Sequence, residues 1–381
     1  MPDQNPQKSI PTWLIFLFQG LVIILSIAIG YFGRAFIARD RGELGLLREA
    51  HGILLENTIL DIPDDPSLEY GMIRGMLAEL GDPYTGFDEP ATHEILTDQL
   101  TGRFGGIGVR FERDIQAQWR LYPIPGSPAL AVGIQDGDLL LAVDGLLVSA
   151  ETDEVTLLSA VRGPEGEIVN ITVERDGEQL NFNIQRQSVP LPSITWHLLP
   201  EDPKIGMLRV HRIAETTANE MQSGIESLLG QGAESLIIDL RDNGGGLVEA
   251  GVDIARLFLE SGEVISESIK GESVRTFEVV EPGPFTDLPL VLLINHTTAS
   301  SAELIAGALK ANQRATLVGT PTYGKTSIQF IFELADGSSV RITSGRWWID
   351  GLSFPLAPDI EVLNDPSGIE LLQAAIKLFN P

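Results

Sequence analysis

Lys325 is the residue at which two different chemistries meet. It lies in the segment 319–326, which matches the phosphate-loop pattern G-x-x-x-x-G-K-[ST]. It also lies 25 residues after Ser300, and a serine hydroxyl becomes a strong nucleophile when a neighbouring amine accepts its proton. Lys325 therefore belongs either to a nucleotide-binding loop or to a serine–lysine hydrolase.

The sequence after Lys325 disfavours the phosphate loop. Such a loop needs a helix that begins at the Lys-Thr pair, because the helix N-terminus faces the phosphates. Here apolar residues alternate over 328–334, a tight Asp-Gly turn follows, and a second extended run occupies 340–343. This pattern predicts a β-hairpin, with Lys325, Ser327 and Gln329 on one face of its first strand. An NTPase is therefore the weaker alternative.

Ser300 lies where a strand gives way to a helix. Residues 290–294 form a continuous apolar run that predicts a buried strand, and residues 302–310 carry apolar side chains at helical spacing. A serine at such a turn is exposed, and the first free N–H groups of the helix gather beside it. The simpler alternative is a helix cap, because Ser300-x-x-Glu303 is also a capping box.

A lysine can act as a base only when it is neutral. The ordinary lysine pKa is about 10.4, so only about 0.1 % of free lysine is neutral near pH 7. Burial or a nearby positive dipole must therefore lower the pKa of Lys325. The apolar neighbours Tyr323 and Phe330 indicate such a setting. The uncharged Gln329 could orient the amine without stabilising its protonated form.

A third segment, residues 235–246, has the composition of an oxyanion hole. A buried strand at 235–239 runs into Gly244, Gly245 and Gly246, and an apolar helix follows. Glycines let the backbone approach a substrate carbonyl and turn N–H groups towards it. The alternative is an ordinary flexible loop.

In this order, the segments resemble the C-terminal processing peptidases, also called tail-specific proteases. The matching stretches are 75–84, 104–109, 239–246, Ser300 with 306–309, 319–325 with Gln329, and 357–362. The resemblance covers residues 45–381. It implies an α/β (α+β) multi-domain chain with a helical N-terminal segment (40–96), a PDZ domain (97–187) and a β-α serine protease core (190–381).

The resemblance implies a role for each matching residue of the core. These roles are Ser300 as the nucleophile, Lys325 as the general base, Gln329 as the group that orients the lysine, and an oxyanion hole made by the N–H of Ser301 and of Gly244 or Gly245. One departure concerns the nucleophile. Ser301-Ala302 reverses the family's usual Ala-Ser order. The sequence therefore leaves open whether Ser300 or Ser301 provides the nucleophilic hydroxyl.

The PDZ domain implied by the resemblance would select the substrate. A nest of backbone N–H groups would hold a peptide's terminal carboxylate; it consists of Gly105, Gly106, Ile107 and Gly108. The peptide would add as a strand beside 107–109, and apolar, carboxylate-ended tails are the expected ligands. Arg162 follows the expected PDZ helix at 155–161. It either neutralises the helix C-terminal dipole or acts as a gate that senses a bound peptide.

Composition excludes several other classes of protein. The chain of 381 residues has a net charge of −27, which disfavours nucleic acid as a partner because phosphate binding needs a basic surface. It has no cysteine, which excludes disulfides, thiol catalysis and cysteine-ligated metals. The five histidines show no ligand spacing, and we expect neither a metal nor a cofactor.

Residues 13–32 form an uncharged stretch long enough to span a bilayer. No small-residue cleavage signature follows it, so we predict an uncleaved single-pass anchor after a short N-terminal tail (1–12). The positive charges after the span would by themselves place the body in the cytoplasm. The family resemblance implies instead a catalytic body outside the cytoplasm.

The sequence therefore predicts a membrane-anchored serine endopeptidase that cuts proteins near their C-termini. Its partners would be protein or peptide substrates with apolar C-termini, and the membrane. The alternative from another class is a catalytically silent PDZ scaffold that only binds peptides. The oligomeric state, a homo-oligomer included, stays open.

Overall fold

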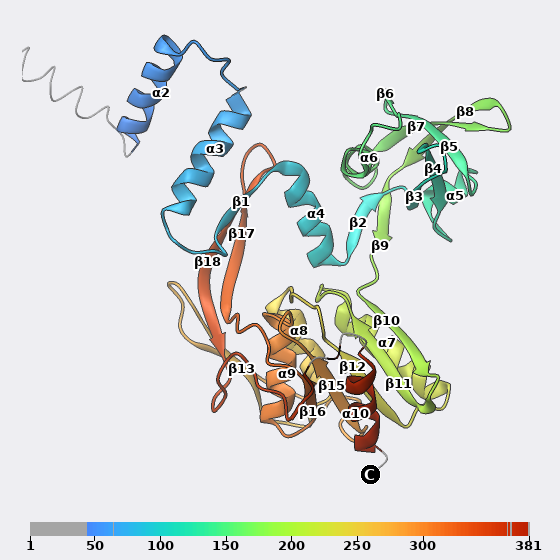
Figure 1. Ribbon diagram of the computed structural model, residues 1–381, viewed down its shortest axis with the longest axis vertical. Coiled ribbons are helices and arrows are strands. Elements are labelled where there is room, and N and C mark those ends of the chain that lie inside the picture. Colours follow the sequence, from blue (N-terminus) through green and yellow to red (C-terminus); the bar gives the residue numbers. More distant parts are fainter. Residues whose placement is uncertain (1–43, 64, 364, 366–367, 380–381) are drawn as a thin grey trace, which may run out of the picture. The chain divides into compact units, whose positions relative to one another are not determined.

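The computed structural model describes residues 44–63, 65–363, 365 and 368–379 (Figure 1). The chain divides into two compact units, Met1–Met72 and Ile73–Pro381. The predicted membrane span, residues 13–32, lies outside the described residues. Within the described ranges, no helix is long and apolar enough to cross a membrane.

The segment predicted to be helical, 40–96, forms helices interrupted by extended chain; its first residues, 40–43, lie outside the described part. In the first unit, α2 (Gly45–Asn57) has no buried residue, and α3 (Asp65–Ala78) continues into the second unit. A short strand that the sequence did not predict, β1 (Gly86–Asp88), precedes α4 (Pro90–Thr101). Helix α4 begins at a proline and ends at Gly102, whose φ of 72° suits a glycine.

The segment predicted to be a PDZ domain contains a sheet in the order β3-β4-β5-β7-β8, with β6 paired to β5. Its strands are β3 (Val109–Arg113), β4 (Trp119–Pro123), β5 (Asp138–Val143), β6 (Leu146–Leu147), β7 (Ile168–Arg175) and β8 (Glu178–Gln185). The helices α5 (Pro128–Ala131) and α6 (Glu154–Val161) complete it, and Leu157 of α6 packs into its core. A two-stranded ribbon of β2 (Arg103–Gly106) and β9 (Gln187–Pro190) joins the incoming and outgoing chain.

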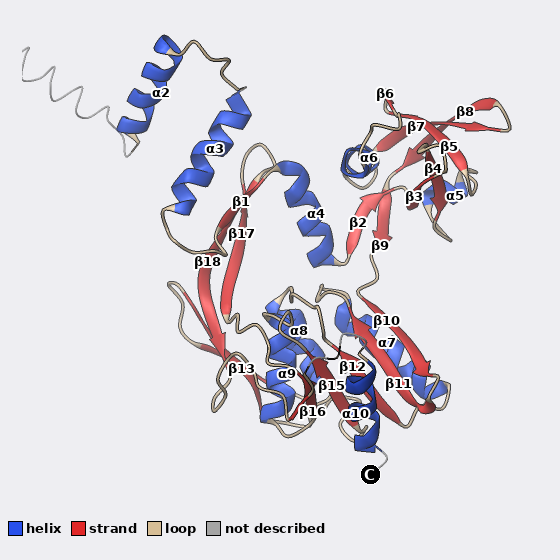
Figure 2. Ribbon diagram, viewed as in Figure 1, coloured by secondary structure: helices blue, strands red, loops and turns tan. Residues whose placement is uncertain are grey.

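The rest of the second unit contains a mixed sheet, here called the core sheet, in the order β10-β11-β12-β15-β16-β19 (Figure 2). The strands β10 (Ile194–Leu199) and β11 (Asp202–Val210) are antiparallel. The remaining neighbours are parallel; they are β12 (Ser235–Asp239), β15 (Leu290–Ile294), β16 (Thr316–Gly319) and β19 (Ile360–Glu361). Strands β12 and β15 are buried along their whole length, as their apolar runs predict.

Alternate residues of the core sheet pack against helices on its two faces. Leu236 and Leu292 join a large core with α7 (Thr217–Gly230), α8 (Val248–Arg256) and α9 (Ser301–Ala311). Ile237 and Val291 belong instead to the core that includes α10 (Ile369–Phe379). Because successive strand residues point to opposite faces, a one-residue slip would expose both sets, and this pattern fixes the register.

The carboxyl ends of β12, β15 and β16 lie side by side, because these strands are parallel neighbours. The glycine segment follows β12, the Ser300 turn follows β15, and the Lys325 loop follows β16. Loops at this edge of a parallel sheet are where ligands usually bind. The fold therefore brings together the three segments that the sequence predicts to be catalytic.

A second sheet has the order β1-β18-β13-β14, with β17 also paired to β18. The strands β17 (Ser327–Glu333) and β18 (Ser339–Trp348) form a hairpin whose turn contains Gly337 at a φ of 83°. The hairpin predicted after Lys325 is therefore confirmed, but its first strand begins at Ser327, so Lys325 lies before this strand and not on its face as predicted. The strands β13 (Glu263–Ile269) and β14 (Arg275–Glu278) extend the sheet, and β1 pairs with the first residues of β18.

Candidate active site

A cavity of about 1000 Å³ brings the three predicted segments together. Its lining includes Gly244 and Gly245 from the loop after β12, Ser300 before α9, and Lys325 with Gln329 at the start of the hairpin. Leucines of α4 and Arg341 of β18 complete part of the wall. The predicted catalytic residues thus share one cavity, while the PDZ residues form a separate group.

Ser300 occupies a strained turn at the N-terminus of α9. Its φ of 56° and ψ of −125° lie in a region that costs a residue with a side chain about 1–3 kcal/mol. A sharp strand-to-helix turn of this kind can present a serine hydroxyl above the sheet, but Ser300 is buried in this structure (8 % exposed) and not exposed as the sequence predicted. Ser301 is fully buried, and its Oγ has no hydrogen-bond partner among the described residues. Of these two serines, Ser300 lines the cavity and Ser301 does not.

Glu303 connects the serine turn to the lysine loop. Its side chain is fully buried and accepts hydrogen bonds from the backbone N–H groups of Ser300 (2.9 Å), Gly324 (2.6 Å) and Lys325 (2.8 Å). The hydroxyl of Thr322 donates another at 2.6 Å. A carboxylate is tolerated in the interior only with such a set of donors. Glu303 therefore fixes the backbone of both predicted catalytic residues through one side chain.

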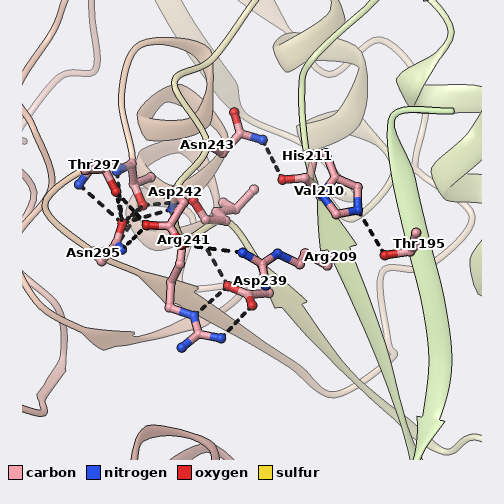
Figure 3. A network of polar contacts seen from close by, with 12 residues as sticks. Thr195, Arg209, Val210, His211, Asp239, Arg241, Asp242, Asn243, Asn295 and Thr297 are labelled. Carbon is pink, nitrogen blue, oxygen red and sulfur yellow. Dashed lines mark hydrogen bonds and ion pairs between the residues drawn. The ribbon is translucent and has the colours of Figure 1, made fainter. Parts of the chain in front are cut away.

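Asn243 holds the glycine loop in place (Figure 3). Its Nδ2 donates to the carbonyl oxygen of Val210 (2.8 Å), its Oδ1 accepts from the N–H of Gly245 (2.8 Å), and its own carbonyl oxygen accepts from the N–H of Ala299 (2.9 Å). The N–H of Gly245 is therefore already used. The N–H of Gly244 has no acceptor among the described residues, so it is available to a ligand.

Gly245 lies against the serine turn. Its φ is 95°, and a Cβ at this position would lie 2.8 Å from the Cβ of Ser300. Both the conformation and the close approach require glycine. This explains why glycine, rather than another residue, stands at position 245.

The loop after β12 is also tied to the loop after β15. Asp242 accepts hydrogen bonds from Asn295 Nδ2 (2.8 Å) and Thr297 Oγ1 (2.9 Å), and these bonds lower the pKa of Asp242 (Figure 3). Arg241 binds the buried Asp239 through Nε at 2.8 Å and Nη2 at 2.7 Å. These contacts make the glycine loop and the serine turn one rigid edge.

Lys325 has the environment that a lysine base needs. Burial lowers its pKa, and the positive charge of Arg341 lowers it further, while Asp82 and Glu303 oppose this change. The Nζ atom lies 4.6 Å from the centroid of the Tyr84 ring. The Tyr84 hydroxyl lies 3.4 Å from that of Tyr323, a contact that raises the pKa of Tyr84 to about 12 together with burial. The phenol therefore stays protonated around neutral pH.

Gln329 shares a strand face with Ser327, although a β-bulge separates Ile328 from Gln329. Its Nε2 donates to Ser327 Oγ (2.8 Å) and to Thr343 Oγ1 (3.1 Å). In this orientation the amide nitrogen is used by two hydroxyl groups. The amide oxygen has no donor in the described part of the chain, so it remains available as an acceptor.

The predicted carboxylate nest lies at the start of the PDZ segment. Gly105 and Gly106 belong to β2, and Ile107 and Gly108 connect β2 to β3. The carbonyl oxygen of Gly105 accepts from Gly163 N–H at 3.2 Å, whereas the N–H groups of Ile107 and Gly108 have no acceptor among the described residues. The adjoining strand β3 lies at the end of its sheet, so within the described residues one of its edges has no strand partner.

Arg162 joins the PDZ helix to α4. Its Nη1 lies 3.0 Å from Oδ2 of Asp98, and its guanidinium lies 5.1 Å from the centroid of the Phe104 ring. Burial raises the pKa of Asp98 to about 6, although the charge of Arg162 opposes this rise. Leu96 and Leu100, from the same helix as Asp98, line the cavity that contains Ser300. Arg162 therefore contacts the helix that forms one wall of the candidate active site.

Four residues of the site escaped the sequence analysis as functional residues: Glu303, Asn243, Tyr84 and Arg341. Glu303 was noticed only as a cap, because its contacts to the lysine loop depend on the fold. Tyr84 ends the stretch 75–84 that resembles the family, but no local pattern marks Tyr84 or Arg341 as part of the site. Within the described residues, no group of three or more histidine, aspartate or glutamate side chains could hold a metal ion.

Several known proteins are similar to this chain. The profile of peptidase family S41 matches residues 204–362, and a PDZ domain profile matches residues 120–175. A carboxyl-terminal-processing protease of Picosynechococcus sp. is 33 % identical over 315 residues, which are 80 % of this chain and 75 % of that protein. The carboxy-terminal processing protease CtpA of Bacillus subtilis is 32 % identical over 287 residues, which are 74 % of this chain and 60 % of that protein.

Among solved structures, the photosystem II D1 C-terminal processing protease is similar to this chain. The two sequences are 28 % identical, the match covers 86 % of this chain and 88 % of the other, and the TM-score is 0.46.

Proposed function

Because this chain belongs to peptidase family S41, among the carboxyl-terminal-processing proteases, we propose that it cuts proteins near their C-termini with Ser300 as nucleophile and Lys325 as base. One observation carries the proposal. Ser300, on its strained turn, and Lys325, with its lowered pKa, line the same cavity and are held by the same Glu303 carboxylate. A peptide-binding scaffold would have no need for this arrangement.

The first half of the reaction is acylation. The neutral Lys325 amine takes the proton of Ser300, whose Oγ attacks the carbonyl carbon of the scissile peptide bond. The negative oxygen that forms accepts hydrogen bonds from the N–H groups of Ser301 and Gly244. Gly244 is favoured over Gly245 because the N–H of Gly245 is already donated to Asn243. Removing one such donor typically costs a factor of about 10²–10³ in kcat.

The second half releases the products. The protonated Lys325 gives its proton to the nitrogen of the leaving peptide, and the C–N bond breaks. Water then attacks the carbonyl carbon of the acyl-serine ester, with Lys325 accepting a proton from the water. The bond between this carbon and Ser300 Oγ breaks, and Lys325 returns the proton to Oγ, which restores the serine and releases the carboxylic acid. Gln329 would orient the lysine throughout, because its amide oxygen is left as an acceptor while its nitrogen is held by Ser327 and Thr343.

The PDZ segment would choose the substrate. The N–H groups of Ile107 and Gly108 are suited to a terminal carboxylate, and a peptide could add as a strand beside β3. Selection of apolar tails would follow from the apolar core that lies under this strand and α6. Arg162 would report peptide binding to α4, and thereby to the cavity.

The experiment that tests the proposal is a cleavage assay on an unfolded protein with an apolar C-terminal tail, with and without ATP. We expect cleavage without ATP by the wild type and by Ser301→Ala, and none by Ser300→Ala. Binding without cleavage by the wild type would support the scaffold instead. A requirement for ATP would support the NTPase.

We also propose that residues 13–32 anchor the chain in a membrane, with the catalytic body outside the cytoplasm. The proposal rests on the length and lack of charge of this stretch. Extraction of membranes at alkaline pH should leave the full-length chain in the pellet, and added protease should reach the body only from the extracytoplasmic side. Release by alkali would contradict the anchor.

A further inference from the structure

Tyr84 lies 241 positions before Lys325 in the sequence, yet the two side chains are in contact. The Lys325 Nζ atom lies 4.6 Å from the centroid of the Tyr84 ring. We propose that Tyr84 is a positioning residue for Lys325. The face of its ring contacts the amine and holds it in place, so a residue from the segment before the PDZ domain forms part of the lysine's surroundings. The inference rests on the proposed Ser300–Lys325 chemistry.

The backbone around Tyr84 is fixed, so the ring has a defined place. Asp82 accepts hydrogen bonds from the N–H of Tyr84 (3.1 Å) and from the hydroxyl of Thr85 (2.6 Å). The Thr85 hydroxyl in turn accepts from the N–H of Thr343 on β18 (3.1 Å). The next residues form β1, which pairs with β18. The loop is therefore bound to the same strand that supports Gln329.

A second contact ties Tyr84 to the lysine loop itself. Its hydroxyl lies 3.4 Å from that of Tyr323, two residues before Lys325. The N–H of Tyr323 donates to the carbonyl oxygen of Thr298 at 3.0 Å, beside the serine turn. The ring is thus placed relative to both the lysine and the serine segment.

The ring has a specific electrostatic effect on the amine. The face of an aromatic ring attracts a cation, so it stabilises protonated lysine relative to neutral lysine. The other groups that face Lys325 are Asp82 from the loop before β1, Glu303 from α9 and Arg341 from β18. Burial and Arg341 favour the neutral amine that starts the reaction. The ring favours the ammonium that forms when Ser300 loses its proton.

The kinetic test compares Tyr84→Phe with Tyr84→Leu. Phenylalanine keeps the ring face and loses the hydroxyl, whereas leucine keeps apolar bulk and loses the ring. The hydroxyl contact with Tyr323 is long, at 3.4 Å, so we expect its loss in Tyr84→Phe to slow acylation by about twofold at most. We expect Tyr84→Leu to be slower by about 2- to 30-fold, the range of a cation–π contact. The rising limb of the pH–rate profile should move to lower pH in Tyr84→Leu, by about 0.3 to 1.5 units.

A merely structural role would slow the reaction without moving this limb. Equal losses in the two folded variants, or an unchanged profile in Tyr84→Leu, would overturn the proposal.

A second measurement does not depend on activity. Reductive methylation with ¹³C-formaldehyde places methyl groups on Lys325 Nζ, and the Lys325→Arg variant identifies their NMR signal. The ring current of Tyr84 should move this signal upfield in the wild type and in Tyr84→Phe, and the displacement should vanish in Tyr84→Leu. A signal without displacement in the wild type would refute the contact between the Tyr84 ring and the Lys325 amine, even if Ser300→Ala is inactive. Activity in Ser300→Ala would refute the serine mechanism and leave the ring contact standing.

Discussion

At the scale of single residues, the protonation state of Lys325 depends on a few named neighbours. Burial and Arg341 lower its pKa, and Asp82 and Glu303 act in the opposite direction. Because the neutral amine is the reactive form, activity should rise with pH through the lowered pKa of this lysine. The position of that rise reports the electrostatics of the site.

Arg341→Gln should move the rise in activity to higher pH. The substitution removes a positive charge that disfavours protonated Lys325, so the lysine pKa returns towards its ordinary value and less amine is neutral at a given pH. The measurement is kcat/KM against pH for the wild type and the variant. Arg346→Gln, an exposed arginine on the same strand, is the matched control and should leave the profile in place.

A companion variant that removes a negative charge sharpens this prediction. Asp88 Oδ1 lies 3.6 Å from Arg341 Nη2 and partly neutralises it. Asp88→Asn should therefore strengthen the effect of Arg341 and move the rise to lower pH. Shifts in the same direction for both variants would show that the profile reports folding rather than the charge on Lys325.

Glu303→Gln should reduce both stability and activity. The buried carboxylate accepts hydrogen bonds from Ser300, Thr322, Gly324 and Lys325. In Glu303→Gln one carboxylate oxygen becomes an amide nitrogen, which is itself a donor and cannot accept these hydrogen bonds. Each buried group left unsatisfied costs about 1–3 kcal/mol. Urea unfolding and cleavage rates measure the two effects, with the exposed Glu226→Gln as control. Full activity in Glu303→Gln would mean that the serine and lysine segments are held by other contacts.

At the scale of elements, the sequence predicts the parts of the core that carry a local pattern. Strands β12 and β15 are continuous apolar runs because both of their faces are covered, and the hairpin after Lys325 alternates around an Asp-Gly turn. The strand β1 has no such pattern. Its three residues become a strand only because β18 offers them hydrogen bonds. For the same reason, the sequence did not reveal the roles of Asn243 and Glu303. Their hydrogen-bond partners lie on loops that come together only after folding.

The ion pair between Arg162 and Asp98 predicts how the PDZ helix and α4 are coupled. Arg162→Ala should reduce, by several-fold, the preference for a substrate with a free apolar C-terminus over the same substrate with an amidated one. Asp98→Asn should act in the same direction, because it removes the carboxylate that Arg162 binds at 3.0 Å. Cleavage rates on the two substrates give the ratio. An unchanged ratio in Arg162→Ala would show that Arg162 only neutralises the C-terminal dipole of the PDZ helix.

The pKa of Asp98 adds a pH dependence to this coupling. Burial raises it to about 6, so the folded protein binds this proton more tightly than the unfolded chain does. The group therefore favours the folded state below its usual pKa of 3.8, and this contribution is lost as the pH rises through about 6. The negative charge of Asp98, which attracts Arg162, is lost as the pH falls through about 6. The preference for a free C-terminus should therefore weaken in the wild type below about pH 6 and be insensitive to pH in Asp98→Asn.

At the scale of the whole molecule, the net charge of −27 should act on substrates before they reach the cavity. A field of this sign attracts cations and raises their association rate, and salt screens it. Of two peptides with the same apolar tail, one with lysines and one with glutamates upstream, the first should show the higher kcat/KM at low ionic strength. The difference should shrink as salt is added. Equal values at all salt concentrations would show that association is not steered.

The measurement that tests the central claim most directly is labelling with a fluorophosphonate, followed by mass spectrometry of the peptides. An activated serine forms a covalent bond to phosphorus and expels fluoride, and no substrate needs to be known. We predict one adduct, on Ser300, that disappears in Ser300→Ala and is strongly reduced in Lys325→Arg, because a guanidinium stays protonated and cannot accept the serine proton. An adduct on Ser301, or equal labelling of Ser300 in Lys325→Arg, would contradict the serine–lysine mechanism.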